Sequence, residues 1–369
     1  MNLIEKNLFT KIIVYDNYQI IQSENVGYVL HDLAKLNRRA IKKHSPEVWQ
    51  NYILREVVEH HLPYHSEIKE YSIKSDLSIL EKKLEEINYK KPEEKEQEIL
   101  KHGGISVELS KVQEKATRTI NNSLDMEALY TELAKLEPFN DKKLLEFSKI
   151  FGLPTGQFVA MGWDAVFENN YILKQFSFLL PLYLKLASYR YIFNGWLALK
   201  ENNESIILEF ENRYKHYLEA ELSRLEIPKE RGGFAEKLPE IITVFLNEKG
   251  PKRILEPINS KIIQKFNFSD LFDIAYYQLS QAMLNDSSFK RCELCGHPFE
   301  VIHEGRRFCP PLPGRKRSTC ENTFNQRLKR AKKKALTLHE EGKSINEISE
   351  LTKDAEVTIR KWIEQKGEK

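Results

Sequence analysis

The hydrophobic positions of this chain recur mainly at helical spacing. Between residues 125 and 289, apolar side chains return every three or four positions, as at Met126, Leu129 and Leu133, which is the spacing of one buried face of an α-helix. Helices are expected over residues 126–136, 141–150, 170–200, 203–225, 236–248 and 268–285. The pattern predicts a mainly α protein whose multi-helix body is an all-helical domain at 125–289.

The N-terminal pattern differs from that of the body. Residues 9–15 and 18–22 read as two strands around the Asp16–Asn17 turn, which predicts a short β-hairpin in a small α/β region at 1–66. Residues 67–124 are densely charged, and Gly103–Gly104 interrupts their helical pattern. We interpret this stretch as a charged helical arm or linker.

Composition excludes several classes of protein. The chain has 369 residues, and its longest uncharged apolar run near the middle lies between Lys174 and Lys185, far short of the roughly 20 residues of a membrane span. The first residues do not form a secretory signal, and all four cysteines fall between Cys292 and Cys320. We therefore expect a cytoplasmic protein with no membrane partner and no disulfide framework.

The net charge of +3 hides a strong asymmetry. Residues 290–369 carry 19 basic and 12 acidic side chains, whereas residues 1–289 carry 38 and 42. Between Arg306 and Lys334, eleven basic residues face the single acidic residue Glu321. This basic segment indicates a polyanionic partner for the C-terminal end of the chain.

The cysteines have the spacing of a metal site. Cys292 and Cys295 form a C-x2-C pair, and Cys309 and Cys320 follow after 13 and ten intervening residues. Four thiolates complete a closed tetrahedral shell, so we predict one structural Zn²⁺ in a finger at 290–322. A redox C-x2-C is the less favoured interpretation, because no thioredoxin-like βαβ pattern surrounds it.

Neighbouring residues support the finger. Gly296 supplies a permissive turn, and Phe299 and Phe308 would form a small apolar core. His297 or His303 could replace one cysteine as a ligand. Cys320 precedes a helical pattern, where the helix dipole is expected to favour a thiolate.

The segment 291–335 resembles the bacterial treble-clef zinc fingers of the CGNR type. The resemblance rests on C-x2-C-G-x2-F, on Arg306–Arg307–Phe308–Cys309, and on a final cysteine that leads into Asn322, Arg327 and a basic helix. The chain has Glu321–Asn322 where that family has Gly-Asn-Arg, and it inserts a basic loop at 310–319. Because the family is regarded as DNA-binding regulators, the resemblance implies nucleic-acid contact.

The finger is followed by a basic helix and a predicted helix-turn-helix at 323–369. Ser344 and Glu347 form a capping-box pattern, and Ala355, Ile359 and Trp362 share one face of a last helix. This arrangement resembles the helix-turn-helix of resolvases and transposases; packing of a small helical cap on the finger is the alternative. The predicted nucleic-acid contacts are Arg306, Arg307, Arg315, Lys316, Arg317, Arg327, Arg330, Lys334, Glu356, Val357, Arg360 and Lys361.

These patterns favour a zinc-dependent DNA-binding transcriptional regulator with a helical body that senses a signal or forms a homo-oligomer. RNA is a possible partner in place of DNA. Two alternatives remain open: an RNA-binding or phage-defence-type effector with an unrecognised N-terminal activity, and a protein-interaction module. No constellation of nucleophile, base or paired carboxylates indicates catalysis.

Overall fold

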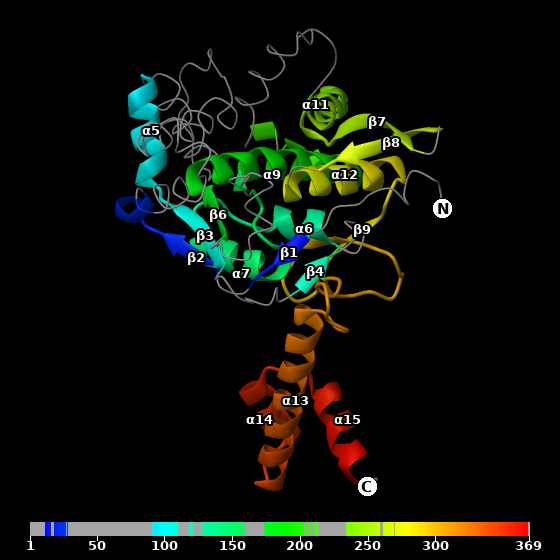
Figure 1. The fold of residues 1–369 in the computed structure, drawn as a ribbon. Coiled ribbons are helices and arrows are strands. Elements are labelled where there is room, and N and C mark those ends of the chain that lie inside the picture. The colour runs from blue at the N-terminus through cyan, green and yellow to red at the C-terminus, as the bar shows by residue number, and fades with distance from the viewer. Residues whose placement is uncertain are drawn as a thin grey trace. The chain divides into compact units, whose positions relative to one another are not determined.

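The computed structural model describes residues 12–15, 18–26, 28, 91–109, 118–120, 126, 128–155, 157–158, 173–202, 204–205, 207–208, 211–212, 234–258, 261–268 and 270–367. The chain divides into two compact units, Met1–Asp286 and Ser287–Lys369, which are taken in turn. Helices dominate the described residues (Figure 1), which confirms the mainly α fold class. No helix among them is long and apolar enough to cross a membrane.

Helix α9 (Leu179–Glu201) forms the centre of the first unit. Its side chains are apolar on almost every face, which is typical of a helix surrounded by other elements. Tyr183, Tyr189 and Phe193 are fully buried. Helices α5 (Pro92–Lys101), α6 (Leu129–Ala134), α11 (Phe234–Lys249) and α12 (Leu271–Leu284) pack against α9. Helix α9 is thus the centre of the core of this unit.

Two polar contacts tie α9 to its neighbours. The Tyr189 hydroxyl donates to the backbone oxygen of Tyr130 at 2.8 Å. Asp270 accepts from the backbone N–H of Phe272 at the start of α12, and it pairs with Lys185 of α9 at 2.5 Å. Burial raises the pKa of Asp270, and the Lys185 ammonium opposes that shift. These contacts satisfy polar groups that the core would otherwise leave unpaired.

A four-stranded antiparallel sheet stands beside the helices, in the order β2–β3–β6–β5. The bounds of its strands are Gln19–Ile21, Gly104–Leu109, Leu173–Phe178 and Gln157–Phe158. Close approach of the strands requires glycine at Gly104, because a Cβ there would lie 2.2 Å from the Phe176 ring.

The predicted N-terminal hairpin is wrong in its pairing. Strand β1 (Ile12–Val14) pairs with β4 (Arg118–Ile120), and β2 pairs with β3. The strands therefore form where expected but pair with strands far along the chain. An alternation of apolar and polar residues predicts that a segment is a strand, but it does not specify which strand will pair with it.

Residues 104–109 also differ from the expected exposed arm. They form β3 inside the sheet, where Ile105 is fully buried, and Ile99 of the preceding α5 is buried as well. The high charge of the residues before and after this segment led to the prediction of an arm or linker, although the segment itself is a short, mainly apolar strand. Residues 29–90, which include most of the small α/β region at 1–66 after its strands and the first part of the expected helical arm, lie outside the described residues.

The body at 125–289 is not all-helical. Residues 173–178 form β6 before α9 begins. In addition, β7 (Lys252–Ile258) pairs with β8 (Lys261–Asn267). Helix α7 (Asp141–Phe151) begins as predicted, and the side chain of Asn140 caps it by accepting from the backbone N–H of Lys143. Most of the predicted helix at 203–225 lies outside the described residues.

The second unit begins with a hairpin, β9 (Phe289–Arg291) paired with β10 (Pro298–Glu300). Three helices follow: α13 (Thr319–Glu340), α14 (Ile345–Thr352) and α15 (Glu356–Gly367). Ala335, Ile348, Ile359 and Trp362 form their shared core. The capping box of Ser344 and Glu347 is present as predicted, and α13 runs unbroken across the boundary expected at 322–323.

Candidate metal centre and basic surface

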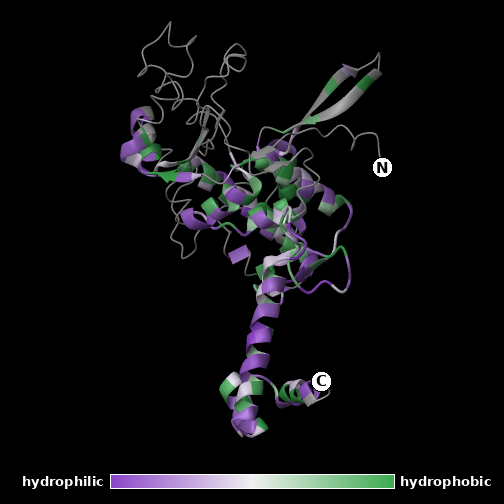
Figure 2. Ribbon diagram, turned by 60° about the horizontal axis from the view of Figure 1, so that its bottom comes forward, coloured by the Kyte–Doolittle hydropathy of each residue, from purple (hydrophilic) through white to green (hydrophobic). Residues whose placement is uncertain are grey.

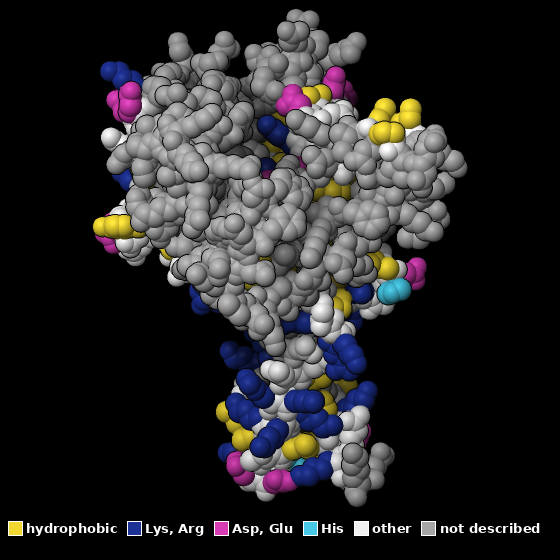
Figure 3. Space-filling view, viewed as in Figure 1, with side chains coloured by type: hydrophobic (Ala, Val, Ile, Leu, Met, Phe, Trp, Pro, Cys, Tyr) yellow, Lys and Arg dark blue, Asp and Glu magenta, His cyan; other side chains and the backbone are white. Residues whose placement is uncertain are grey.

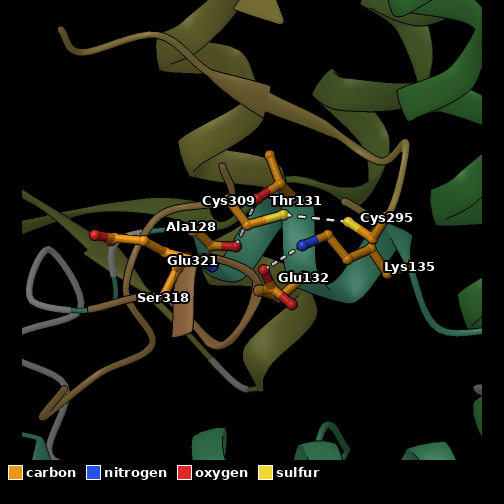
Figure 4. A network of polar contacts seen from close by, with 8 residues as sticks. All are labelled: Ala128, Thr131, Glu132, Lys135, Cys295, Cys309, Ser318 and Glu321. Carbon is orange, nitrogen blue, oxygen red and sulfur yellow. Dashed lines mark hydrogen bonds and ion pairs between the residues drawn. The ribbon is translucent and has the colours of Figure 1, made fainter. Parts of the chain in front are cut away.

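The structure brings the four cysteine sulfurs together. Their Sγ atoms all lie within 4.8 Å of one another, and the Sγ atoms of Cys295 and Cys309 are 3.5 Å apart (Figure 4). A tetrahedral Zn²⁺ with bonds of about 2.3 Å separates its sulfur ligands by roughly 3.8 Å. The donor set therefore has the number, chemistry and spacing of a four-thiolate metal site.

The β9–β10 hairpin positions the first pair of ligands. The N–H of Cys292 donates to the carbonyl of His297 at 2.9 Å, and the N–H of Gly296 donates to the carbonyl of Cys292 at 2.8 Å. Gly296 has φ +71° and open space around its Cα. The backbone conformation, rather than crowding, favours glycine at this turn.

The second pair comes from the loop before α13 and from the first turn of that helix. Ser318 caps α13 by accepting from the N–H of Glu321 at 2.9 Å (Figure 4), and Cys320 follows immediately. Phe299 and Cys309 are buried with Cys292 in one small core, against which Phe308 packs. One member of the cysteine cluster thus lies in the first turn of the basic helix, as its sequence position predicted.

The cysteines have shifted acidities. Burial raises the pKa of Cys292, but hydrogen bonds from the amides of Cys295, Leu294 and Cys309 outweigh it and bring the pKa to about 7. Burial and the neighbouring thiols Cys295 and Cys292 raise the pKa of Cys320 to about 12. The expected lowering by the helix dipole is outweighed here. Amide donors at Cys292 stabilise a thiolate, which is the form that binds a metal.

Arg307 has a structural partner. Its Nε donates to Glu293 Oε1 at 2.7 Å, and its guanidinium lies 5.4 Å and 5.5 Å from the ring centroids of Phe308 and Phe324. The ion pair lowers the pKa of Glu293. The N–H of Glu293 also donates to the carbonyl of Arg307 at 3.1 Å. Arg307 therefore joins the C-x2-C turn, the third-cysteine loop and α13, while the nearby Arg306 is half-buried.

Basic side chains gather on α13 and on the loop before it, and Figure 3 shows many of them on one face of this region. Arg315 is exposed and bonds Thr319 at 3.3 Å. Several other basic side chains are exposed and have no ion-pair or hydrogen-bond partner among the residues that the structure describes: Lys316, Arg317, Arg327, Lys329, Arg330 and Lys333. Lys329 and Lys333 were not among the predicted contacts, although they share this surface.

The last two helices are less basic. Glu356 pairs with Arg360 at 3.6 Å, which partly neutralises the predicted recognition face. Val357 is 79% exposed, and Arg360 and Lys361 are exposed beside it. Lys334 donates to the carbonyl of Leu351 at 3.0 Å and so ties α13 to the end of α14. Of these residues, Val357 and Lys361 are the most available to an external partner.

One structural residue escaped the sequence analysis, namely Glu293, which holds Arg307. The turn between α14 and α15 lies at Lys353, which has φ +61°. The proximity of Glu293 to two cysteines was visible, but its pairing with a residue 14 positions later was not. The cluster contains neither His297 nor His303, because the four cysteines form it by themselves.

Comparisons with known proteins give no assignment. No family model, no curated protein and no solved structure matches the chain. The geometry of the cysteine cluster and of the basic surface is therefore the basis for any functional conclusion.

Proposed function

We propose that the protein is a DNA-binding transcriptional regulator whose residues 287–369 form a zinc-stabilised nucleic-acid-binding module. The observation that carries the proposal is the surface of unpaired basic side chains on α13 and its preceding loop, beside a closed set of four thiolates. The first unit would sense a signal or form a homo-oligomer.

The arrangement of charges on α13 supports a polyanionic ligand. Lys329 and Lys333 are four positions apart on the helix, as are Arg330 and Lys334. Like charges at this spacing repel each other and destabilise a helix. A row of phosphates would relieve that repulsion, and it would release condensed counterions on binding.

Zinc would act in this module as a structural ion. Four thiolates leave no open coordination position for a substrate or water, so the chemistry supplied is cross-linking rather than catalysis. Cys320 is the ligand that belongs to α13. Metal binding would therefore fix the start of the basic helix relative to the β9–β10 hairpin.

The three-helix arrangement favours duplex DNA over RNA. Helices α14 and α15 pack with α13 around one core, and such a pair places its second helix in the DNA major groove. Val357 would contact a thymine methyl group, and Arg360 or Lys361 would contact guanine or phosphate. The A-form major groove of RNA is too narrow for this mode of recognition.

The test compares two sets of charge removals in the full chain. Arg327→Gln, Arg330→Gln and Lys333→Gln together should weaken duplex binding and lower the salt slope, d log K/d log[salt], by about 2 to 3. The control is Lys142→Gln with Lys149→Gln, which removes exposed charges from α7 in the other unit. Fluorescence anisotropy on duplex DNA, duplex RNA and single strands measures both effects. Equal salt slopes for the two variants would refute the proposal, and a preference for RNA would favour the effector alternative.

A further inference from the structure

Strands β7 and β8 form an isolated two-stranded ribbon. Their register pairs seven residues of each strand, from Lys252 with Asn267 to Ile258 with Lys261. No other strand in the described ranges pairs with either of them. Figure 2 shows the ribbon extending away from the helices of its unit. Its attachment lies at one end, where Phe266 and Phe268 contact Tyr277 of α12 at centroid distances of 5.1 and 5.8 Å.

The ribbon leaves apolar side chains in solvent. Pro257 lies opposite Ile262, and Leu255 is two positions from Pro257, so the register places all three on one face. Leu255 is 71% exposed and Ile262 is 76% exposed. Exposed apolar residues gathered on one surface commonly mark a binding site.

The ribbon is also locally basic. Its strands contain Lys252, Arg253, Lys261 and Lys265 against the single acidic residue Glu256. The surrounding residues 1–289 have four more acidic than basic side chains. The ribbon therefore carries a local excess of positive charge within a region whose net charge is negative. Among the described residues, the ring contacts that the ribbon makes with α12 lie near its base.

We propose that this ribbon is a second nucleic-acid contact, an arm that enters a groove of duplex DNA. Its basic residues would bind phosphates, and Leu255, Pro257 and Ile262 would press against or between base pairs, as apolar wedges do in minor-groove proteins. This proposal rests on the proposed function only for its choice of ligand, because the ribbon belongs to the first unit and the proposed binding module to the second. Its charge argues against self-association, since two copies would bring like charges together.

The experiment removes the apolar face of the ribbon in the full chain. Leu255→Ser with Ile262→Ser should weaken duplex binding about tenfold and reduce DNA bending, measured by energy transfer between end labels. The salt slope should stay unchanged, because no charge is removed. Leu284→Ser is the matched control, as Leu284 is 79% exposed at the end of α12. Lys261→Gln with Lys265→Gln should instead lower the salt slope by about 2.

The outcomes separate the arm from the C-terminal module. If the ribbon variants bind and bend DNA like the control while the α13 variant is weakened, the arm is overturned and the proposed function stands. If only the ribbon variants weaken binding, the arm stands and the C-terminal proposal fails. Two other results would also overturn the arm, if the ribbon variants still bind DNA normally. A smaller mass of the variants in solution than of the unsubstituted chain would show that the ribbon joins copies of this chain. Lost binding of the variants to anionic phospholipid vesicles would show that the ribbon contacts a lipid surface. Matching thermal unfolding of control and variants establishes that the fold is retained.

Discussion

The two units are stabilised in different ways. The first has large buried side chains on α9 and on the elements around it, including Tyr189, Phe272 and Tyr276. The second has two small cores, one around Phe299 beside the cysteines and one around Trp362 among the three helices. Small segments bury too little apolar surface to fold by that means alone, and metals commonly compensate. Cross-linking by a metal at the four cysteines would leave the surface of the second unit free to carry charge.

Metal removal tests this difference most strongly. Chelation, or Cys309→Ser, should unfold the β9–β10 hairpin and the first turn of α13, because structural zinc contributes on the order of 10 kcal/mol to a finger. The first unit should keep its structure. Hydrogen exchange measured with mass spectrometry, together with metal analysis and DNA binding, would record the change.

Adding zinc back after chelation is the control, and it should restore slow exchange at residues 289–300. Slow exchange that survives chelation would show that apolar packing suffices for the finger. A metal-free Cys309→Ser protein that still binds DNA would separate binding from metal.

A core substitution tests whether the second unit is itself divided. Trp362→Ala removes the largest side chain of the three-helix core and should cost about 3 to 5 kcal/mol. We expect α14 and α15 to unfold while the four cysteines retain their metal, since Phe299 and the cysteines form a separate cluster. Circular dichroism and bound-metal content measure the two effects. Loss of metal along with the helices would show one cooperative unit instead of two.

The smallest effect concerns the turn between α14 and α15. Lys353 has φ +61°, a conformation that glycine adopts more readily than residues with a Cβ. Lys353→Gly should therefore stabilise the helix pair by up to about 1 kcal/mol. Glu350→Gly, in the helical and exposed position three residues earlier, should destabilise it by about 1 kcal/mol. Urea unfolding of both variants checks the opposite signs, and a loss of stability in both would contradict the role of the turn.

The sequence predicted the second unit better than the first. Cysteine spacing and the Ser344–Glu347 pair are local signals: the four cysteines lie close together and the capping box is present, as each pattern predicted. The strands of the first unit depend on partners far along the chain, as Ile12 does on Ile120. No local pattern specifies such a pairing, so the first two strands were wrongly predicted to pair with each other in a hairpin.

Arg307 shows the same limit within the candidate site. An arginine in a basic segment indicates phosphate binding, and the composition around it favours that interpretation. Its bond to Glu293 and its packing on Phe308 and Phe324 arise only once the finger has folded. The positive charge of this segment could therefore be predicted from the sequence. Which of its side chains remain free to bind an external partner could not.

The continuity of α13 has a geometric consequence. Cys320 and Arg327 lie on one unbroken helix, so the number of residues between them sets the direction in which the basic side chains point relative to the cysteine cluster. One inserted residue would rotate everything beyond it by about 100° and advance it by about 1.5 Å. An insertion of seven residues would nearly restore the original direction. The number of residues between the last cysteine and the first arginine of α13 thus fixes the angle between these two side chains around the helix axis. Any functional variant of this module would have to preserve that angle.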